Sequence, residues 1–177
     1  MACCLLVGSG YATIPLALKI SLKGTAMDNS IHEKARELIR KQRTCVLATA
    51  AKNHPHCSLM AYTCNEKCSE LYMLTGRKTQ KYKNLMENPA VSILIDTRQS
   101  AIERDHKRTN ALTLSGRFER VASSQEETKI RESIKTTHPD LGDLLDAPDT
   151  EVVRIKIESF LLLLGPKDAH YGEDLTW

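Results

Sequence analysis

The segment LYMLTGRKTQKYKNLMENPAVSILID, residues 71–96, decides the expected fold of this chain. Residues 71–75 are apolar and β-rich, and the basic middle of the segment is typical of a short helix. This helix is expected to end before Asn88-Pro89, because a residue that precedes proline is pushed out of helical geometry. The apolar run that follows, residues 90–96, predicts a strand that is buried on both faces.

Positive charge gathers in the middle of this segment, on Arg77, Lys78, Lys81 and Lys83. One interpretation is that these side chains form the solvent-exposed face of a surface helix. The other is that the helix begins at Thr79 and offers its unpaired N–H groups, the threonine hydroxyl and nearby cations to a phosphate. The segment by itself leaves both interpretations open.

Length and composition predict one globular domain. The chain has 177 residues, of which 41% are hydrophobic, and this is enough for one substantial core. A formal net charge of +3 is too small to indicate nucleic-acid binding, because no DNA- or RNA-binding motif accompanies it. The sequence also lacks the motifs of dinucleotide-binding folds, P-loop NTPases, zinc proteases and α/β-hydrolases.

The first 26 residues are apolar, but neither a secretion signal nor a membrane span is expected there. No positively charged region precedes the apolar part, and glycines and Pro15 interrupt it. Met27 looks like a natural beginning of the chain. Residues 1–26 are therefore interpreted as a leader, an N-terminal extension or a misassigned start, and residues 27–177 as the single folded domain.

Four of the six cysteines fall in or beside apolar segments, namely Cys45, Cys57, Cys64 and Cys68. Cys64 and Cys68 have a CxxxC spacing, but no second Cys/His pair follows at the separation of a zinc site, so no metal is expected. Reduced and mostly packed thiols are typical of a cytoplasmic protein. We expect a cytoplasmic protein with no membrane or nucleic-acid partner.

The rest of the sequence alternates strands with short helices. Capping-box patterns predict helices that begin at Ser30 and Ser124, and the charged residues 97–109 predict a mobile loop. Gly116 is expected to mark a bulge or a close approach within its strand. Further strands are predicted at residues 44–51, 56–64, 110–122 and 151–164. Five or six strands with mostly hairpin connections indicate a small closed or half-closed barrel, not a doubly wound sheet.

Three segments in this order resemble the pyridoxamine 5′-phosphate oxidase-like FMN-binding split β-barrel family. They are VLATAAKNHPHCSLMAY (46–62), LYMLTGRKTQKYKNLMENPAVSILI (71–95) and LTLSGRFERV (112–121), and the resemblance covers roughly residues 31 to 164. It implies a mainly β (α+β) fold, a six-stranded antiparallel split β-barrel with flanking short helices. It also implies a homodimer that holds FMN at the interface between the subunits.

The resemblance assigns cofactor-binding roles to particular residues. Main-chain groups and small side chains of one strand are expected to lie along the flavin ring, and the end of a later strand is expected to contact the ribityl-phosphate. A further strand is expected to approach the flavin from across the subunit boundary. In that order, these residues are Ser58, Leu59 and Met60, then Thr75, then Asn110 and Ala111.

The family's Ser-Arg-Lys at the start of the phosphate-binding helix corresponds here to Thr79-Gln80-Lys81. Hydroxyl and lysine are kept, and the middle arginine is replaced by glutamine. Lys78 or Arg77, just upstream, is expected to supply the missing charge. A phosphate monoester carries close to two negative charges, which a helix N-terminus with lysines and a hydroxyl favours. With the resemblance included, phosphate binding becomes the preferred interpretation of the charged run.

The resemblance implies an FMN-dependent oxidoreductase that passes hydride or electrons between a nicotinamide cofactor, NAD(P)H, and a small electrophilic substrate. No side chain is expected to act as an acid or a base, because the flavin carries the chemistry. Oxidation of pyridoxamine phosphate is not expected, because the tail AHYGEDLTW (169–177) lacks the family's Arg-x-His element. Two alternatives remain. One is a non-catalytic flavin-binding or redox-sensing module, and the other is a haem-binding or haem-degrading protein with His170 as the candidate ligand.

Overall fold

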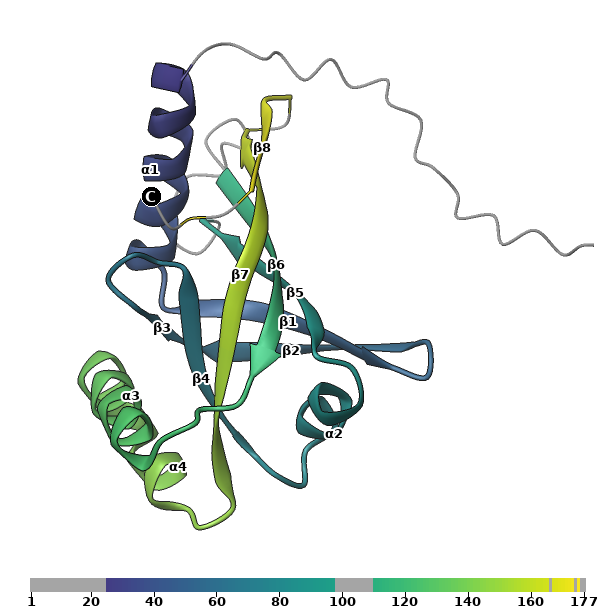
Figure 1. Cartoon of the computed structure of the whole chain (residues 1–177), viewed down its shortest axis with the longest axis vertical. Coiled ribbons are helices and arrows are strands. Elements are labelled where there is room, and N and C mark those ends of the chain that lie inside the picture. Colours follow the sequence, from purple (N-terminus) through teal and green to yellow (C-terminus); the bar gives the residue numbers. More distant parts are fainter. Residues whose placement is uncertain (1–24, 98–109, 166, 174, 176–177) are drawn as a thin grey trace, which may run out of the picture.

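The computed structural model describes residues 25–97, 110–165, 167–173 and 175. In this part of the chain eight strands form one antiparallel sheet that is curled into a half-barrel, with short helices at its flanks (Figure 1). The helices are α1 (Thr25–Lys41), α2 (Gln80–Glu87), α3 (Ser124–Thr137), the 3-10 turn Pro139–Leu141 and α4 (Gly142–Asp146). The strands are β1 (Thr44–Ala51), β2 (His54–Ala61), β3 (Thr63–Cys64), β4 (Glu70–Gly76), β5 (Ala90–Asp96), β6 (Asn110–Glu119), β7 (Thr150–Leu164) and β8 (Ala169–Glu173).

The strand order is β2-β1-β5-β6-β7-β4-β3, and β8 pairs with β7. The expected number of six strands is wrong, because the segment after β2 forms a separate short strand and the C-terminal tail adds another. The long strand β7 explains how the sheet splits. Its first half, Thr150–Lys156, pairs with β4, whereas Ser159–Leu163 pairs with β8 along the same edge. β2 and β4, near opposite ends of the strand order, also contact each other.

Local sequence explains the shape of the individual strands. Lys52 and Asn53 have positive φ angles of 49° and 63°, so a two-residue turn joins β1 to β2. A register shift falls between Ser115 and Gly116 in β6, as predicted. A Cβ atom at Gly116 would lie 2.6 Å from the carbonyl oxygen of Lys156, so the close approach of these strands requires glycine.

The expectation that residues 90–96 are buried on both faces is wrong. In β5 the buried residues Val91, Ile93 and Ile95 alternate with more exposed ones, and Ser92 is exposed. An antiparallel sheet that packs one face on the core produces this alternation. The alternation could not be recognised in the sequence of β5, because the outward residue Leu94 is also hydrophobic.

Two of the predicted helix starts are also corrected. Helix α1 begins at Thr25, five residues before the residue predicted as its cap, so Ser30 lies inside the helix. Helix α3 is capped by Ser123, whose hydroxyl accepts a hydrogen bond from the Glu126 amide at 3.1 Å, one residue earlier than predicted. Both helices bury apolar residues at helical spacing. Ile31, Ala35 and Ile39 of α1 belong to the main core, and Ile130 and Ile134 of α3 to a second, smaller hydrophobic cluster.

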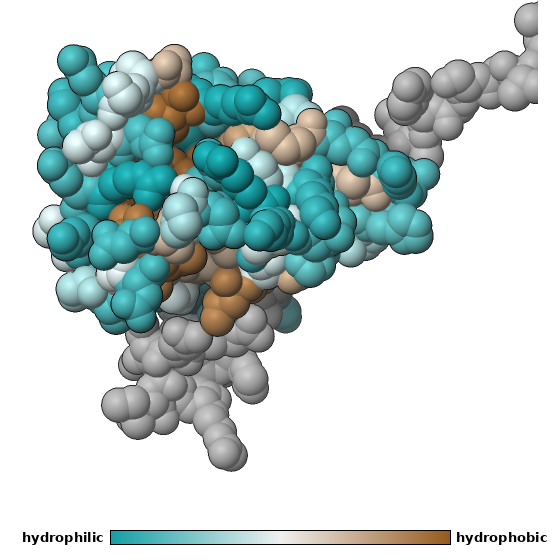
Figure 2. Space-filling model, turned by 90° about the horizontal axis from the view of Figure 1, so that it is seen from below, coloured by the Kyte–Doolittle hydropathy of each residue, from teal (hydrophilic) through white to brown (hydrophobic). Residues whose placement is uncertain are grey.

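Figure 2 shows the end of the molecule at which α2, α3 and α4 lie. Hydrophilic side chains cover most of this end, and hydrophobic surface is confined to small patches. Within the described ranges, no helix has the length and apolar character needed to cross a membrane. The expectations for residues 1–24 and for a mobile loop at 98–109 fall outside the described residues.

Candidate functional site

The basic helix α2 begins where the sequence predicted. Thr79 is its N-cap, with φ −73° and ψ 154°, and its Oγ1 accepts a hydrogen bond from the Tyr82 amide at 3.3 Å. The Thr79 hydroxyl donates its single proton to the Gly76 carbonyl at 2.9 Å. The 3.0 Å contact between the hydroxyls of Thr75 and Thr79 must then be donated by Thr75. Both hydroxyls are therefore used to shape the turn between β4 and α2.

The first turn of α2 keeps donors without acceptors. Among the described residues, no partner is found for the backbone amides of Gln80 and Lys81, which are two of the orphan N–H groups of a helix start. No acidic residue lies in this turn. The side chains of Lys78 and Lys81 likewise have no hydrogen-bond or ion-pair partner in the described ranges. The start of α2 therefore combines two free amides with two unpaired lysines, and the Asp149 carboxylate is the acidic group beside the preceding turn at Gly76.

Arg77 does not contribute to this set of donors. Its guanidinium pairs with the carboxylate of Glu151, which raises the pKa of Arg77 further, and its backbone amide donates to the Asp149 carbonyl at 2.9 Å. Of the two cations expected to replace the family's arginine, Lys78 is the one left unpaired.

A buried polar chain fixes α2 to the sheet, and this feature was missed by the sequence analysis. Asn84 in α2 accepts from Gln80 Nε2 at 2.7 Å and donates from Nδ2 to the Thr49 hydroxyl in β1 at 3.1 Å. Asn84 and Thr49 are each 2% exposed. An amide and a hydroxyl at such depth are stabilised only by being paired. The only signal was that Asn84 sits beside Leu85 on the side of α2 that faces the core.

The predicted ring-binding residues lie on β2, which is an edge strand paired with β1 alone. Alternation sends their side chains to different faces, since Met60 is 6% exposed in the core and Leu59 is 70% exposed. Ser58 is partly buried on the core side. An edge strand has main-chain donors and acceptors that are not used by the sheet, and these are the groups that were expected to meet a flavin ring.

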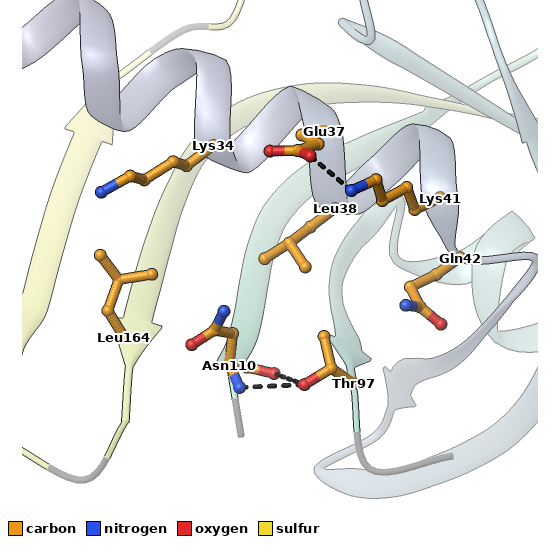
Figure 3. A pocket seen from close by; sticks show the side chains of 8 residues that line it. All are labelled: Lys34, Glu37, Leu38, Lys41, Gln42, Thr97, Asn110 and Leu164. Atoms are coloured by element: carbon orange, nitrogen blue, oxygen red, sulfur yellow. Dashed lines mark hydrogen bonds and ion pairs between the residues drawn. The ribbon is translucent and has the colours of Figure 1, made fainter. Parts of the chain in front are cut away.

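Asn110 begins β6 at a different place in the molecule. Its backbone amide donates to the Thr97 hydroxyl at 3.0 Å, and Figure 3 shows both residues across a cavity from α1. The cavity has a volume of about 690 Å³ and is lined by Lys34, Glu37, Leu38, Lys41, Gln42, Thr97, Asn110 and Leu164. Of the predicted cofactor-binding residues, Asn110 is the one that lines it, so the cavity is separate from the start of α2.

One outward face of the sheet carries an apolar row that crosses six strands. Cross-strand partners point to the same face, and the pairing registers place one hydrophobic residue or threonine beside the next. Exposed large hydrophobic side chains stand at both ends of the row: 70% at Leu59, and 37% and 55% at Leu161 and Tyr171. The row runs Leu59, Val46, Leu94, Thr113, Leu161, Tyr171.

The C-terminal tail takes part in the sheet. His170 and Tyr171 lie in β8, which pairs with β7. The ring of Phe160 occupies the space beside Gly172, where a Cβ atom would lie 2.4 Å from it. The Nε2 atom of His170 is 2.9 Å from an Asp168 carboxylate oxygen, and the side chain is 24% exposed.

Comparison with solved structures identifies the same fold in several proteins. A haem-binding protein from Mycobacterium smegmatis is 19% identical with a TM-score of 0.72, and the match covers 86% of this chain and 59% of that chain. An FAD-binding protein from Mesorhizobium loti is 18% identical with a TM-score of 0.61, over 73% and 91% of the two chains. The haem storage protein HutZ from Vibrio cholerae is 18% identical with a TM-score of 0.60, over 82% and 97%. These likenesses establish the fold alone.

Comparison by sequence gives the family. No curated protein is similar enough in sequence to match this chain. The family model described as pyridoxamine 5′-phosphate oxidase matches residues 31–163, which include β1 to β6 and nearly all of β7. This range contains the capped helix α2, the edge strand β2 and the bulged strand β6. The chain therefore belongs to the pyridoxamine 5′-phosphate oxidase-like split-barrel family.

Proposed function

We propose that the protein is an FMN-binding oxidoreductase of this family. The observation that carries the proposal is the start of α2, where two backbone amides without partners coincide with the unpaired cations Lys78 and Lys81. A dianionic phosphate monoester fits this donor set, because it accepts hydrogen bonds from both amides and is attracted by both lysines. Thr75 and Thr79 would hold the turn in shape, since their hydroxyls already bond within it.

The edge strand β2 would hold the ring of the flavin. Residues Ser58 to Met60 lie on this edge strand, where alternate residues direct their main-chain groups away from the sheet, and such groups complement the polar edge of an isoalloxazine. The bound flavin would supply hydride or electron transfer at its N5 position. The protein would position the ring, exclude water and set the reduction potential through hydrogen bonds and nearby charge.

The proposed assembly is a homodimer with the cofactor at the interface. A two-fold interface uses the same patch on both subunits, and the outward apolar row from Leu59 to Tyr171 is a self-complementary candidate. Ala111 lies on the same outward face, two residues before Thr113 of that row. A partner docked on this face would bring its own β6, with Asn110 and Ala111, toward the edge strand that is proposed to hold the flavin. Light scattering would report a dimer for the full chain and a monomer for Leu161→Lys.

The proposed reaction uses NAD(P)H as electron donor and a small electrophile, such as a quinone or nitro compound, as acceptor. Oxidation of pyridoxamine phosphate is not proposed, because the tail lacks the family's Arg-x-His element. Four cysteines of the described chain are free thiols, which supports a cytoplasmic location.

The visible spectrum of protein purified without added cofactor tests this function. A flavin spectrum is expected, and denaturation should release FMN and not FAD. Oxidation of NAD(P)H faster than that by free FMN would support an enzyme, whereas a rate equal to that of free FMN would leave a passive flavin-binding module. Colourless protein that does not take up FMN would contradict the proposal.

Haem binding is the second candidate, because two of the structural neighbours reported above are described as haem-binding or haem storage proteins. His170 would be the ligand, yet its Nε2 atom lies against Asp168 in β8 and would have to leave that contact to reach an iron. A Soret band that forms on addition of haem and is lost in His170→Ala would favour this candidate. A band that persists in the variant would exclude His170 as the ligand.

A further inference from the structure

Two cysteines meet at the turn that joins β3 to β4. Cys64 ends β3 and Cys68 lies two residues before β4, and their Sγ atoms are 3.8 Å apart. The separation must shorten to about 2.05 Å in a disulfide. The two sulfur atoms must therefore approach each other by about 1.8 Å.

Hydrogen bonds of the turn hold the two thiols together. The Cys68 amide donates to the Asn65 carbonyl at 3.0 Å, and the Asn65 side-chain oxygen accepts from the amides of Ser69 at 2.9 Å and Glu70 at 3.2 Å. Cys68 has a φ of 57°, a left-handed conformation that is uncommon for a residue with a side chain. The surrounding hydrogen bonds maintain this conformation, and it directs Cys68 toward Cys64.

The environment of the pair favours a thiolate. The hydrogen bond from Cys64, together with the positive charges of Arg40 and Arg36 and against the effect of burial, lowers the pKa of Cys68 to about 7. The same hydrogen bond and burial raise the pKa of Cys64. Arg40 is held beside the turn by a hydrogen bond from its Nη2 atom to the Glu66 carbonyl at 3.1 Å. Cys68 thus ionises more readily than an ordinary cysteine, and a thiolate is the reactive form of cysteine.

We propose that Cys64 and Cys68 form a reversible intrachain disulfide when the protein meets a peroxide. Cys64 is the more exposed residue of the pair, so its sulfur attacks hydrogen peroxide while its proton passes along the hydrogen bond to Cys68. The O–O bond breaks, and the hydroxide that leaves takes this proton to become water, which gives the Cys64 sulfenic acid and a Cys68 thiolate. The Cys68 thiolate then attacks the Cys64 sulfenic acid, the S–S bond forms, and the hydroxide that leaves takes a proton to become water. Two electrons pass from the dithiol to the peroxide, and a small dithiol reductant returns them to the pair.

The other described thiols are in different environments. Cys45 is 3% exposed in the core, and burial raises its pKa to about 12, so it should stay a thiol. Cys57 is exposed on the outward face of β2, far from a second thiol in the pairing register, and is suited only to bonds between molecules. Cys57→Ser therefore removes the exposed competing thiol of the described chain and leaves the proposed pair intact.

A peptide map tests the proposal directly, because trypsin cleaves after Lys67, between the two cysteines. The full-length Cys57→Ser protein is treated with hydrogen peroxide, alkylated to block remaining thiols and digested without reductant. We expect peptide 53–67 joined to peptide 68–77 with the loss of two hydrogen atoms, and separation of the two on addition of dithiothreitol. Cys45→Ser should leave the joined peptide unchanged, and Cys64→Ser and Cys68→Ser should each abolish it.

The opposite results would overturn the proposal. They are recovery of peptides 53–67 and 68–77 as separate alkylated species after peroxide treatment, or the conversion of either cysteine to sulfinic acid without a joined peptide. The measurement on the Cys57→Ser protein decides the matter even if a variant of Cys64 or Cys68 does not fold. It uses no flavin, so its outcome is independent of the proposed cofactor.

Discussion

Positive side chains lie near both ends of β4, but the two ends differ in whether their backbone amides have hydrogen-bond partners. At its first end, Asn65 satisfies the amides of the turn, and arginines from α1 stand beside a pair of packed thiols. At its last end, the start of α2 has two amides and two lysines without partners in the described chain. Amides that are already hydrogen-bonded within a turn offer nothing to a ligand, whereas amides without an acceptor at a surface are available to one. Positive charge alone therefore does not identify the cofactor site.

The largest effect is expected from Lys81→Ala at the start of α2, which follows the last residue of β4. Loss of one charge-assisted hydrogen bond to the FMN phosphate should weaken FMN binding by about 1.5–3 kcal/mol, roughly 10- to 150-fold in dissociation constant. Fluorescence titration measures the change. Lys83→Ala is the matched control, because Lys83 lies on the same helix and is exposed. Equal affinities of the two variants would remove Lys81 from the site.

Asn65→Ala should affect the turn that precedes β4 and leave the start of α2 unchanged. It removes the acceptor of two backbone amides and should lower the free energy of unfolding by about 1–3 kcal/mol. Urea denaturation followed by circular dichroism gives this quantity, and FMN affinity should not change. Asn65→Asp keeps the acceptor and should recover most of the stability. A loss of FMN affinity in Asn65→Ala would show that the two ends of β4 are coupled.

Thr79→Ala removes the N-cap of α2 and the shared acceptor of Thr75 and Tyr82. Loss of an N-cap hydroxyl costs about 1 kcal/mol of stability, which thermal or urea unfolding resolves. FMN binding should also weaken modestly, because the helix start that presents the amides is less well fixed. Thr79→Ser keeps the hydroxyl and should behave like the unaltered protein, and a defect in both variants would assign the effect to the methyl group.

The smallest effect is expected from Arg77→Gln. Its guanidinium pairs with Glu151 and is not directed to the start of α2, so FMN affinity should stay within experimental error. Lys78→Gln should weaken binding several-fold, since Lys78 is the unpaired cation at this position. Titrations of both variants at low salt make the comparison. A stronger defect in Arg77→Gln than in Lys78→Gln would reverse the assignment of the two cations.

Sequence patterns predicted the features that depend on neighbours in the chain. The cap at Thr79, the break at Asn88-Pro89 and the bulge at Gly116 follow from local backbone chemistry, and all three are confirmed. Contacts between distant segments could not be predicted from the sequence. Examples are the hydrogen bond from Asn84 to Thr49 and the pairing of β8 with β7. The pairing of Arg77 with Glu151 joins residues 74 positions apart and could not be foreseen from the charge run.

The errors in the helix starts have a common cause. Ser30 and Ser124 each have a glutamate three residues later, but the cap is decided by where the backbone leaves extended geometry. Ser123 supplies the cap of α3 because its own backbone is extended, with φ −124° and ψ 145°, and α1 continues upstream past Ser30 to Thr25. Serines that follow one another or lie within a helical pattern leave the start ambiguous.

The central claim is that the start of α2 binds the phosphate of a flavin mononucleotide. The most direct test compares the dissociation constants of FMN and riboflavin, which differ by that phosphate alone, on protein from which bound flavin has been removed. We predict that FMN binds roughly 100-fold more tightly than riboflavin, a difference of about 2.7 kcal/mol. Equal affinity for the two flavins would contradict the account, because the phosphate would then make no contact that matters.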